Sequence, residues 1–188
     1  MESDGGRDRR IGKTRKAIKR ALAKLMIDKN LEKINVSELC NIADISRRTF
    51  YLHYSSVEAV FKEIEDDIFS GYYNLQCRYN QNGKYDMQGI YSALVRGITN
   101  DLAYYRDLAK GKGSAELFIR LYSSFRSIRL DFITNNEQST MYHVQTFLNA
   151  GLIATIFEWL CSDSPITIQE LGDCIQRICL AGHKEFDF

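Results

Sequence analysis

The spacing of apolar residues along the chain predicts an all-α protein. From Thr14 to about Lys29, apolar residues recur at intervals of three and four, which is the period of one helical face, and basic residues occupy the other faces. The chain contains one proline, Pro165, and little alternation of β-branched residues, so long helices can run with few interruptions. The apolar residues of this first helical face are Ala17, Ile18, Ala21, Leu22, Leu25 and Met26.

Two short helices are predicted to follow the first one. Asn35 and Glu38 have the spacing of a capping box, which begins a helix whose buried side is formed by the apolar residues after Asn35. A short polar break then precedes a helix from Arg47 to Tyr54. Phe50 and Tyr54 are four residues apart in that helix, so they share a face and are expected to be buried.

The remainder of the chain also has helical patterns. Ser55 and Glu58 form a second capping-box pattern, which opens a long helix towards Tyr72 or Leu75. The clearest loop covers residues 80–86 and contains Gly83. Four further stretches are expected to be helical, roughly 87–102, 114–134, 138–161 and 167–182.

The charge is distributed unevenly, although the net charge is only +1. Residues 1–55 carry 13 Lys and Arg against 7 Asp and Glu, whereas residues 56–188 carry 12 against 17. Positive charge is therefore concentrated in less than a third of the chain. This distribution is typical of a module that binds a polyanion, attached to an acidic body that does not need to touch it.

Several classes of protein are disfavoured. The chain has no run of about 18 apolar residues and no apolar segment behind its polar N-terminus, so we expect a cytoplasmic protein without membrane association. It has no glycine-rich phosphate loop, no nucleophile elbow and no histidines at metal-ligand spacing, so we expect neither an enzyme nor a bound cofactor or metal. The five cysteines are expected to be reduced and buried, with a redox-sensing pair or a metal site as the alternatives.

Two short helices joined by a turn and packed on an amphipathic helix form a helix-turn-helix, whose second helix enters the DNA major groove. Arginines at the start of that helix can bind guanine, and Thr49 can meet a thymine methyl group. Tyr51, His53 and the residues that open the preceding helix can donate to phosphates. The candidate DNA-binding residues are Asn35, Ser37, Ser46, Arg47, Arg48, Thr49, Tyr51 and His53.

The alternative interpretation of these residues is a solvated helix face whose arginines pair with nearby acids. His53 has a second alternative, a packing or hydrogen-bonding role against the first helix. A helical adaptor whose basic end binds RNA or an acidic protein is the corresponding alternative for the whole chain.

The residues from Thr14 to Phe61 resemble the TetR-like regulators. The resemblance is carried by Thr14–Ile18, by Val36–Cys40 and above all by the string from Ile45 to Tyr54, Ile-Ser-Arg-Arg-Thr-Phe-Tyr-Leu-His-Tyr. It covers about a quarter of the chain. It implies a helix-turn-helix DNA-binding domain at 11–56 and an all-α dimerisation and effector-binding domain at 57–188, joined by a long helix. Residues 1–10 are rich in Gly, Asp and Arg, and this composition predicts a disordered basic arm.

Two positions depart from the family pattern. Asp44 stands in the turn where the family usually has Gly, and Asp tolerates the turn geometry. Val57 stands where many members have a phosphate-contacting Lys. We therefore expect affinity for the DNA backbone to depend more on the basic residues at the N-terminus, which are Arg7, Arg9, Arg10, Lys13, Arg15 and Lys16.

The C-terminal part is expected to hold a homodimer. Small residues in the middle of the helix at 138–161 allow another helix to approach closely, and the helix at 167–182 carries an apolar stripe. Two such helices from each protomer would form a four-helix interface. Dimerisation also follows from function, because one helix-turn-helix reads too few base pairs to select a site in a genome. The alternative is that both helices serve only the core of the protomer.

The resemblance further implies a ligand-responsive repressor that binds a palindromic operator in double-stranded DNA, with activation as the alternative. Its regulatory domain would bind a small-molecule effector or a protein co-regulator. Aromatic and polar residues of the middle helices are the candidates for the effector pocket, although such residues more often form core. They are Tyr91, Tyr104, Tyr105, Phe118, Tyr122, Phe125, His143 and Trp159.

Overall fold

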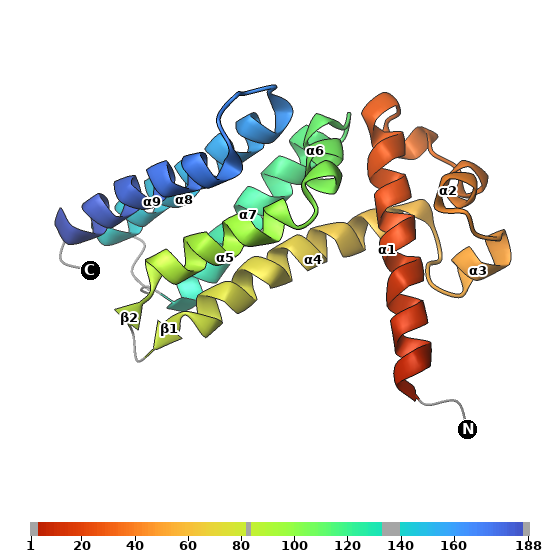
Figure 1. Ribbon diagram of the computed structural model, residues 1–188, viewed down its shortest axis with the longest axis horizontal. Helices are drawn as coiled ribbons and strands as arrows, with labels where there is room; N and C mark the ends of the chain where they lie inside the picture. The colour runs from red at the N-terminus through yellow and green to blue at the C-terminus, as the bar shows by residue number, and fades with distance from the viewer. Residues whose placement is uncertain (1–3, 82–83, 133–139, 186–188) are drawn as a thin grey trace.

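The computed structural model describes residues 4–81, 84–132 and 140–185, and within them the predicted all-α fold is confirmed (Figure 1). The N-terminal helices are α1 (Asp4–Asp28), the 3-10 turn η1 (Leu31–Lys33), α2 (Val36–Ala43), α3 (Arg47–Tyr51) and α4 (Val57–Arg78). A short antiparallel hairpin follows, made of β1 (Asn80–Gln81) and β2 (Lys84–Tyr85). The remaining helices are α5 (Met87–Thr99), α6 (Leu102–Lys110), α7 (Ser114–Phe132), α8 (Thr140–Cys161) and α9 (Ile168–Glu185).

The first three helices pack as one unit, with α2 and α3 on the same side of α1 (Figure 1). The predicted apolar face of α1 supplies Ile18, Leu22 and Met26, which are fully buried. Phe50 is also fully buried and Tyr54 is 5% exposed, so the predicted burial of this pair is confirmed. The start of α4 adds to this core, as do Leu108 of α6 and Leu117 of α7.

Three helix boundaries differ from the predictions. Helix α1 begins at Asp4, so residues 4–10 are helical where a disordered arm was expected. Helix α3 ends at Tyr51 rather than Tyr54, because the Phe50 carbonyl accepts from the amides of His53 and Tyr54 in a tight turn. The cap of α4 is Ser56 rather than its neighbour Ser55, since the Ser56 side chain accepts from the Ala59 amide at 3.3 Å.

Helix α6 was not predicted at all. The pattern between Met87 and about Leu102 predicts one helix, but α5 ends at Thr99 and α6 begins after Asp101. The available signal was the run Thr99-Asn100-Asp101, since Asn and Asp favour turns and helix caps. The break matters because it places the Asp101 carboxylate at the start of α6, facing α1.

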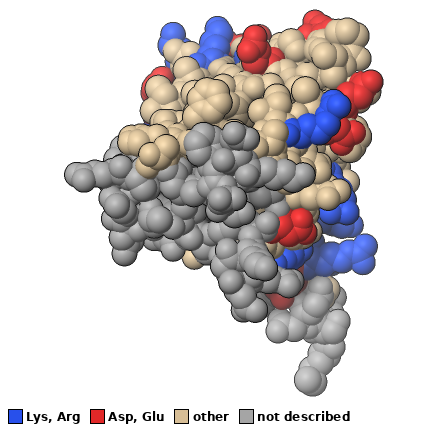
Figure 2. Space-filling view, turned by 90° about the vertical axis from the view of Figure 1, so that its left-hand side faces the viewer, with Lys and Arg blue, Asp and Glu red and all other residues tan. Residues whose placement is uncertain are grey.

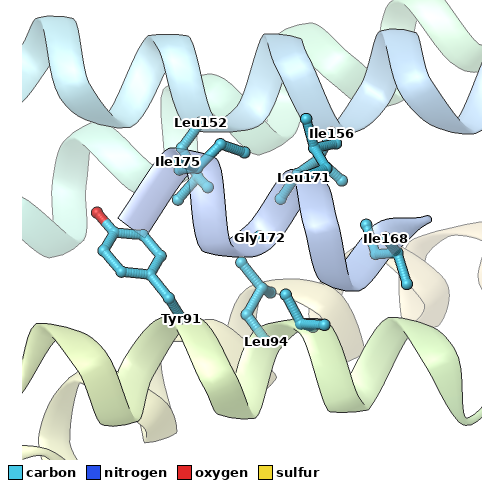
Figure 3. Close-up of a pocket in the computed structure, with 9 residues that line it drawn as sticks. Tyr91, Leu94, Leu152, Ile156, Ile168, Leu171, Gly172 and Ile175 are labelled. Carbon is cyan, nitrogen blue, oxygen red and sulfur yellow. The ribbon is translucent and has the colours of Figure 1, made fainter. Parts of the chain in front are cut away.

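Helix α4 leads from the N-terminal unit into a body formed with α5–α9 (Figure 1). Helix α9 packs against α5 and α8 through apolar side chains, which leave a gap of only about 10 Å³ between the three helices (Figure 3). Gly172 makes this approach possible, because a Cβ added there would lie 2.5 Å from Cγ2 of Val95. None of the helices in the described ranges is long and apolar enough to cross a lipid bilayer.

Candidate nucleic-acid interface

Local capping fixes helix α2 at both ends. At its start the Asn35 side chain accepts from the Glu38 amide at 3.0 Å, and the Glu38 carboxylate accepts from the Asn35 amide at 3.4 Å, so the predicted capping box is present. At its end Asp44 adopts a left-handed conformation with φ of 53°. Aspartate reaches this region more easily than most residues, and it ends the helix where glycine is usual. The turn to α3 is therefore set by short-range interactions.

Ser46 caps α3 in turn. Its hydroxyl accepts from the Thr49 amide at 3.0 Å and lies 2.9 Å from the Thr49 hydroxyl. Both residues belong to the predicted DNA-binding set, and the structure places their hydroxyl groups in contact with each other. Within the free protein, their role is to begin α3 in a fixed orientation.

The outward side of α3 carries the residues best suited to contact a ligand. Arg47 and Arg48 are exposed, and the Tyr51 side chain is 52% exposed while its ring packs edge-on against Phe50. Phe50 points into the core, so the helix has one buried and one open side. Because Phe50 is packed in the core, the exposed side chains of α3 have a fixed orientation.

Sequence reasoning did not single out Leu52, which is the most exposed large apolar residue in the described part of the chain at 77%. It follows Phe50 by two positions, about 200° around a helix, and therefore lies almost opposite the buried ring. That angle was the available signal.

The remaining predicted residues lie at the two ends of the helical pair. Asn35 and Ser37 are exposed at the beginning of α2, and His53 is half-buried directly after α3. Because α2 packs against α3, the unit presents polar side chains from two helices, together with the unpaired amides that open α2.

The predicted basic arm divides into two groups. Arg9, Arg10 and Lys13 are exposed on the first turns of α1, which extend beyond the other helices of the unit (Figure 1). The side chain of Arg7 lies outside the described residues. Arg15 and Lys16 instead form ion pairs with acidic residues of the same chain.

One side of α1 carries four basic residues that pair with acids of α4 and with Asp101, the residue before α6. Arg15 lies over the Tyr54 ring and binds Glu63. Lys19 binds Glu63 at 3.1 Å and also contacts Asp67. Lys16 and Arg20 both bind Asp101, at 3.2 Å and 2.7 Å. Part of the charge asymmetry in the sequence therefore joins the N-terminal unit to the body.

These contacts shift the acidity of the carboxylates. Burial would raise the pKa of Glu63, but hydrogen bonds from Arg15 and Lys19 outweigh burial and hold the pKa below its ordinary value of 4.5. Burial also opposes the shift at Asp101, where hydrogen bonds from Arg20 and Lys16 lower the pKa. Both carboxylates are thus held in their charged form.

A cavity of about 360 Å³ lies in the body, behind this junction. It is bounded by α4–α8 and lined mostly by aliphatic and aromatic side chains. Two of the predicted pocket residues, Tyr105 and Phe118, line it. The polar side chains in its lining are those of Asp67, Tyr72 and Tyr105.

The other predicted pocket residues lie elsewhere. Tyr91 faces the small gap shown in Figure 3, and Tyr104 lines a separate charged cleft beside α1. Trp159 is buried and donates to the Ile166 carbonyl at 2.8 Å. Tyr122 and His143 are exposed, and the side chain of Phe125 is outside the described residues.

Helices α8 and α9 expose apolar surface. Phe147 on α8 is 74% exposed and Ile178 on α9 is 58% exposed, while Gly151 has open space around it. At the end of the body, basic and acidic side chains lie among one another along the margin of the described surface (Figure 2). Both helices thus carry exposed apolar side chains, which the predicted dimer interface would need.

Comparison with known proteins gives a fold but no close relative. No family model matches the chain, and no curated protein matches it. Its structure is similar to the dihydroxyacetone kinase operon activator DhaS, with a TM-score of 0.61 and 20% identity over 91% of this chain and 96% of that chain. A TetR transcriptional regulator from Streptococcus agalactiae 2603V gives a TM-score of 0.48 and 23% identity, over 94% and 98% of the two chains. The chain therefore resembles DhaS in fold over nearly its whole length, as its helix-turn-helix sequence resembles the TetR-like regulators.

Proposed function

We propose that this protein is a TetR-like transcriptional regulator that binds double-stranded DNA as a homodimer. One observation carries the proposal: α3 is seated through the buried Phe50 and presents Arg47, Arg48 and Tyr51 to solvent. A short helix fixed in this way, following a capped helix and a tight turn, is the arrangement that places side chains in the major groove.

Each exposed group has a suitable counterpart on DNA. Arg47 and Arg48 bind guanine, and Leu52 contacts a thymine methyl group. Tyr51 and His53 donate to phosphates, as do Asn35, Ser37 and the amides that open α2. Ser46 and Thr49 set the orientation of α3. The exposed Arg9, Arg10 and Lys13 add sequence-independent attraction to the backbone.

Dimerisation through α8 and α9 is supported by their exposed apolar residues. Phe147 and Ile178 would lose contact with water in such an interface, which favours association. Gly151 and Ala154 on α8 leave room for close approach of a second helix. A two-fold dimer of this kind would read a palindromic operator, because its two α3 helices are related by the same symmetry.

We further propose that the regulator represses transcription and responds to a small molecule bound in the cavity of about 360 Å³. This volume lies within the range of ligand sites in proteins, about 300–1,000 Å³. Activation is the second candidate, because DhaS, whose fold this chain shares, is an operon activator. A reporter under the selected operator, with and without the protein, separates repression from activation.

The test is selection of bound sequences from random duplex DNA by the full chain at near-physiological salt. We expect an enriched inverted repeat, since two symmetric reading heads select two half-sites. Binding that only fades as salt rises, with no enriched sequence, would show an electrostatic adaptor and overturn the proposal.

Substitutions assign the selected sequence to α3. Arg47→Ala combined with Tyr51→Ala should sharply reduce the sequence preference, because loss of one base-specific contact costs about 1–3 kcal/mol of discrimination. Arg96→Ala removes a basic charge from an exposed position on α5 and serves as the matched control. It should leave the preference intact. Equal effects of the two variants would assign the binding to net charge rather than to α3.

A further inference from the structure

Asp67 belongs to two cavities at once. It lines the apolar cavity of about 360 Å³ on one side. On the other side it lines a charged cleft of about 330 Å³ between α1, α4 and α6, where it contacts Lys19. Ile68 and Tyr105 are shared by the two linings as well. This part of α4 is therefore the wall between the ligand cavity and the helix that carries the DNA-binding unit.

The charges in the lining restrict what the apolar cavity can bind. Among the residues that line it there is no Lys, Arg or His, and Asp67 is the charged one. An anionic ligand would lose its hydration without gaining a cation, and it would be repelled by Asp67. Aliphatic and aromatic side chains form the rest of the wall and favour an apolar body. An apolar molecule with a cationic end matches both features.

The cation that Asp67 now holds can be replaced at little cost. Lys19 has a second partner in Glu63, at 3.1 Å, so it remains paired when Asp67 turns to a ligand. The Asp67 side chain is 55% exposed, whereas Lys19 and Glu63 are mostly covered. Asp67 is thus the more accessible acid of this cluster, and an ammonium group on a ligand offers it the same chemistry as Lys19.

We propose that the cavity takes an apolar ligand with a single cationic end, and that this end binds Asp67 in competition with Lys19. The inference rests on the proposed ligand response. It specifies the class of ligand and the ion pair through which the ligand would affect α1. Occupation of the cavity removes one ion pair between α1 and α4 and so alters how firmly the DNA-binding unit is held. An uncharged ligand of the same shape would leave that ion pair in place.

Three probes with the same chain and different charge test the ligand class: octylammonium, octanol and octanoate. Their affinities are measured by calorimetry on the full chain without DNA. We expect octylammonium to bind roughly two- to fivefold more tightly than octanol, the range of a partly exposed ion pair, and octanoate to bind most weakly. Equal affinities, tightest binding of octanoate, or no saturable binding of any probe would overturn the proposal.

Variants test the competition. Asp67→Asn should remove the advantage of octylammonium and leave the affinity for octanol unchanged. Asp66→Asn is the matched control, because Asp66 is the exposed neighbour on the same helix and does not line the cavity. Lys19→Gln should tighten octylammonium binding, since it removes the competing cation. An unchanged or weaker affinity in Lys19→Gln, or an equal effect of Asp66→Asn, would overturn the assignment.

These measurements are independent of the proposed DNA binding. They contain no operator, so a failed operator selection would refute the regulator and leave the order of the three affinities to decide the ligand class. Conversely, a selected operator with equal affinities for the three probes would retain the regulator and refute the cationic ligand.

Discussion

In the unit formed by α1–α3, large apolar side chains such as Ile18, Leu22 and Phe50 are completely buried. In the body, by contrast, many large apolar side chains border the cavity or solvent. The first arrangement fixes the direction of a few exposed side chains. The second leaves space that a ligand can fill and a surface that a second copy can cover. A filled core suits the part that we propose binds DNA, and an incompletely filled core suits the part that we propose binds a ligand.

The sharpest way to break this comparison is to remove one aromatic ring from each region. Phe50→Ala should cost about 3–5 kcal/mol of unfolding free energy, because it empties a packed site. Phe118→Ala should cost under about 2 kcal/mol, because its half-buried ring already borders the cavity and loses fewer contacts. Urea unfolding of both variants measures the difference, and equal losses would show that the two regions are packed alike.

The same contrast separates what the sequence could predict from what it could not. The capping box at Asn35, the turn at Asp44 and the burial of Phe50 depend on residues close in the chain, so their pattern was visible. The α3 boundary was set three residues too far, because a tight turn rather than a longer helix brings Tyr54 to the core. Short-range signals thus located the candidate interface well.

Long-range features were not visible in the sequence. The contact of Arg15 with Glu63 joins residues 48 apart, and that of Arg20 with Asp101 joins residues 81 apart. The composition shows that the two parts carry opposite net charges, but it does not show that their charged residues form ion pairs with each other. Only two of the predicted pocket residues, Tyr105 and Phe118, line the cavity, for a related reason. An apolar pattern predicts which side of a helix is covered and cannot show where packing is incomplete.

Two glycines sharpen the comparison within the body. Gly172→Ala should destabilise the protein by about 1–2 kcal/mol, because its Cβ would meet Val95 where α9 packs on α5. Gly71→Ala should stabilise it by about 0.5–1 kcal/mol, since Gly71 lies in α4 beside the cavity with open space around it and alanine favours the helix. Thermal unfolding of both variants measures whether each substitution raises or lowers the stability. A loss at Gly71 as large as at Gly172 would mean that no space exists there.

The junction between the two regions gives the smallest expected effect. Glu63→Gln should cost on the order of 1 kcal/mol at neutral pH, since it removes the charge that Arg15 and Lys19 share. In the wild type this contribution is present above pH 4.5 and is lost as the pH falls through the lowered pKa of Glu63. Glu63→Gln should therefore lose less stability than the wild type when the pH is lowered from 7 to about 3.5.

Urea unfolding of the two proteins at both pH values measures this linkage, with Asp66→Asn as the control that removes one charge from an exposed position of the same helix. The control should keep the wild-type pH dependence. If Glu63→Gln kept it as well, the ion pairs at Glu63 would contribute nothing to holding α1 on α4. The route from the cavity to the unit that we propose binds DNA would then have to pass through the pairs of Lys16 and Arg20 with Asp101 or through apolar contacts. Among the latter, Ile64 and Val60 of α4 are fully buried in the core they share with α1.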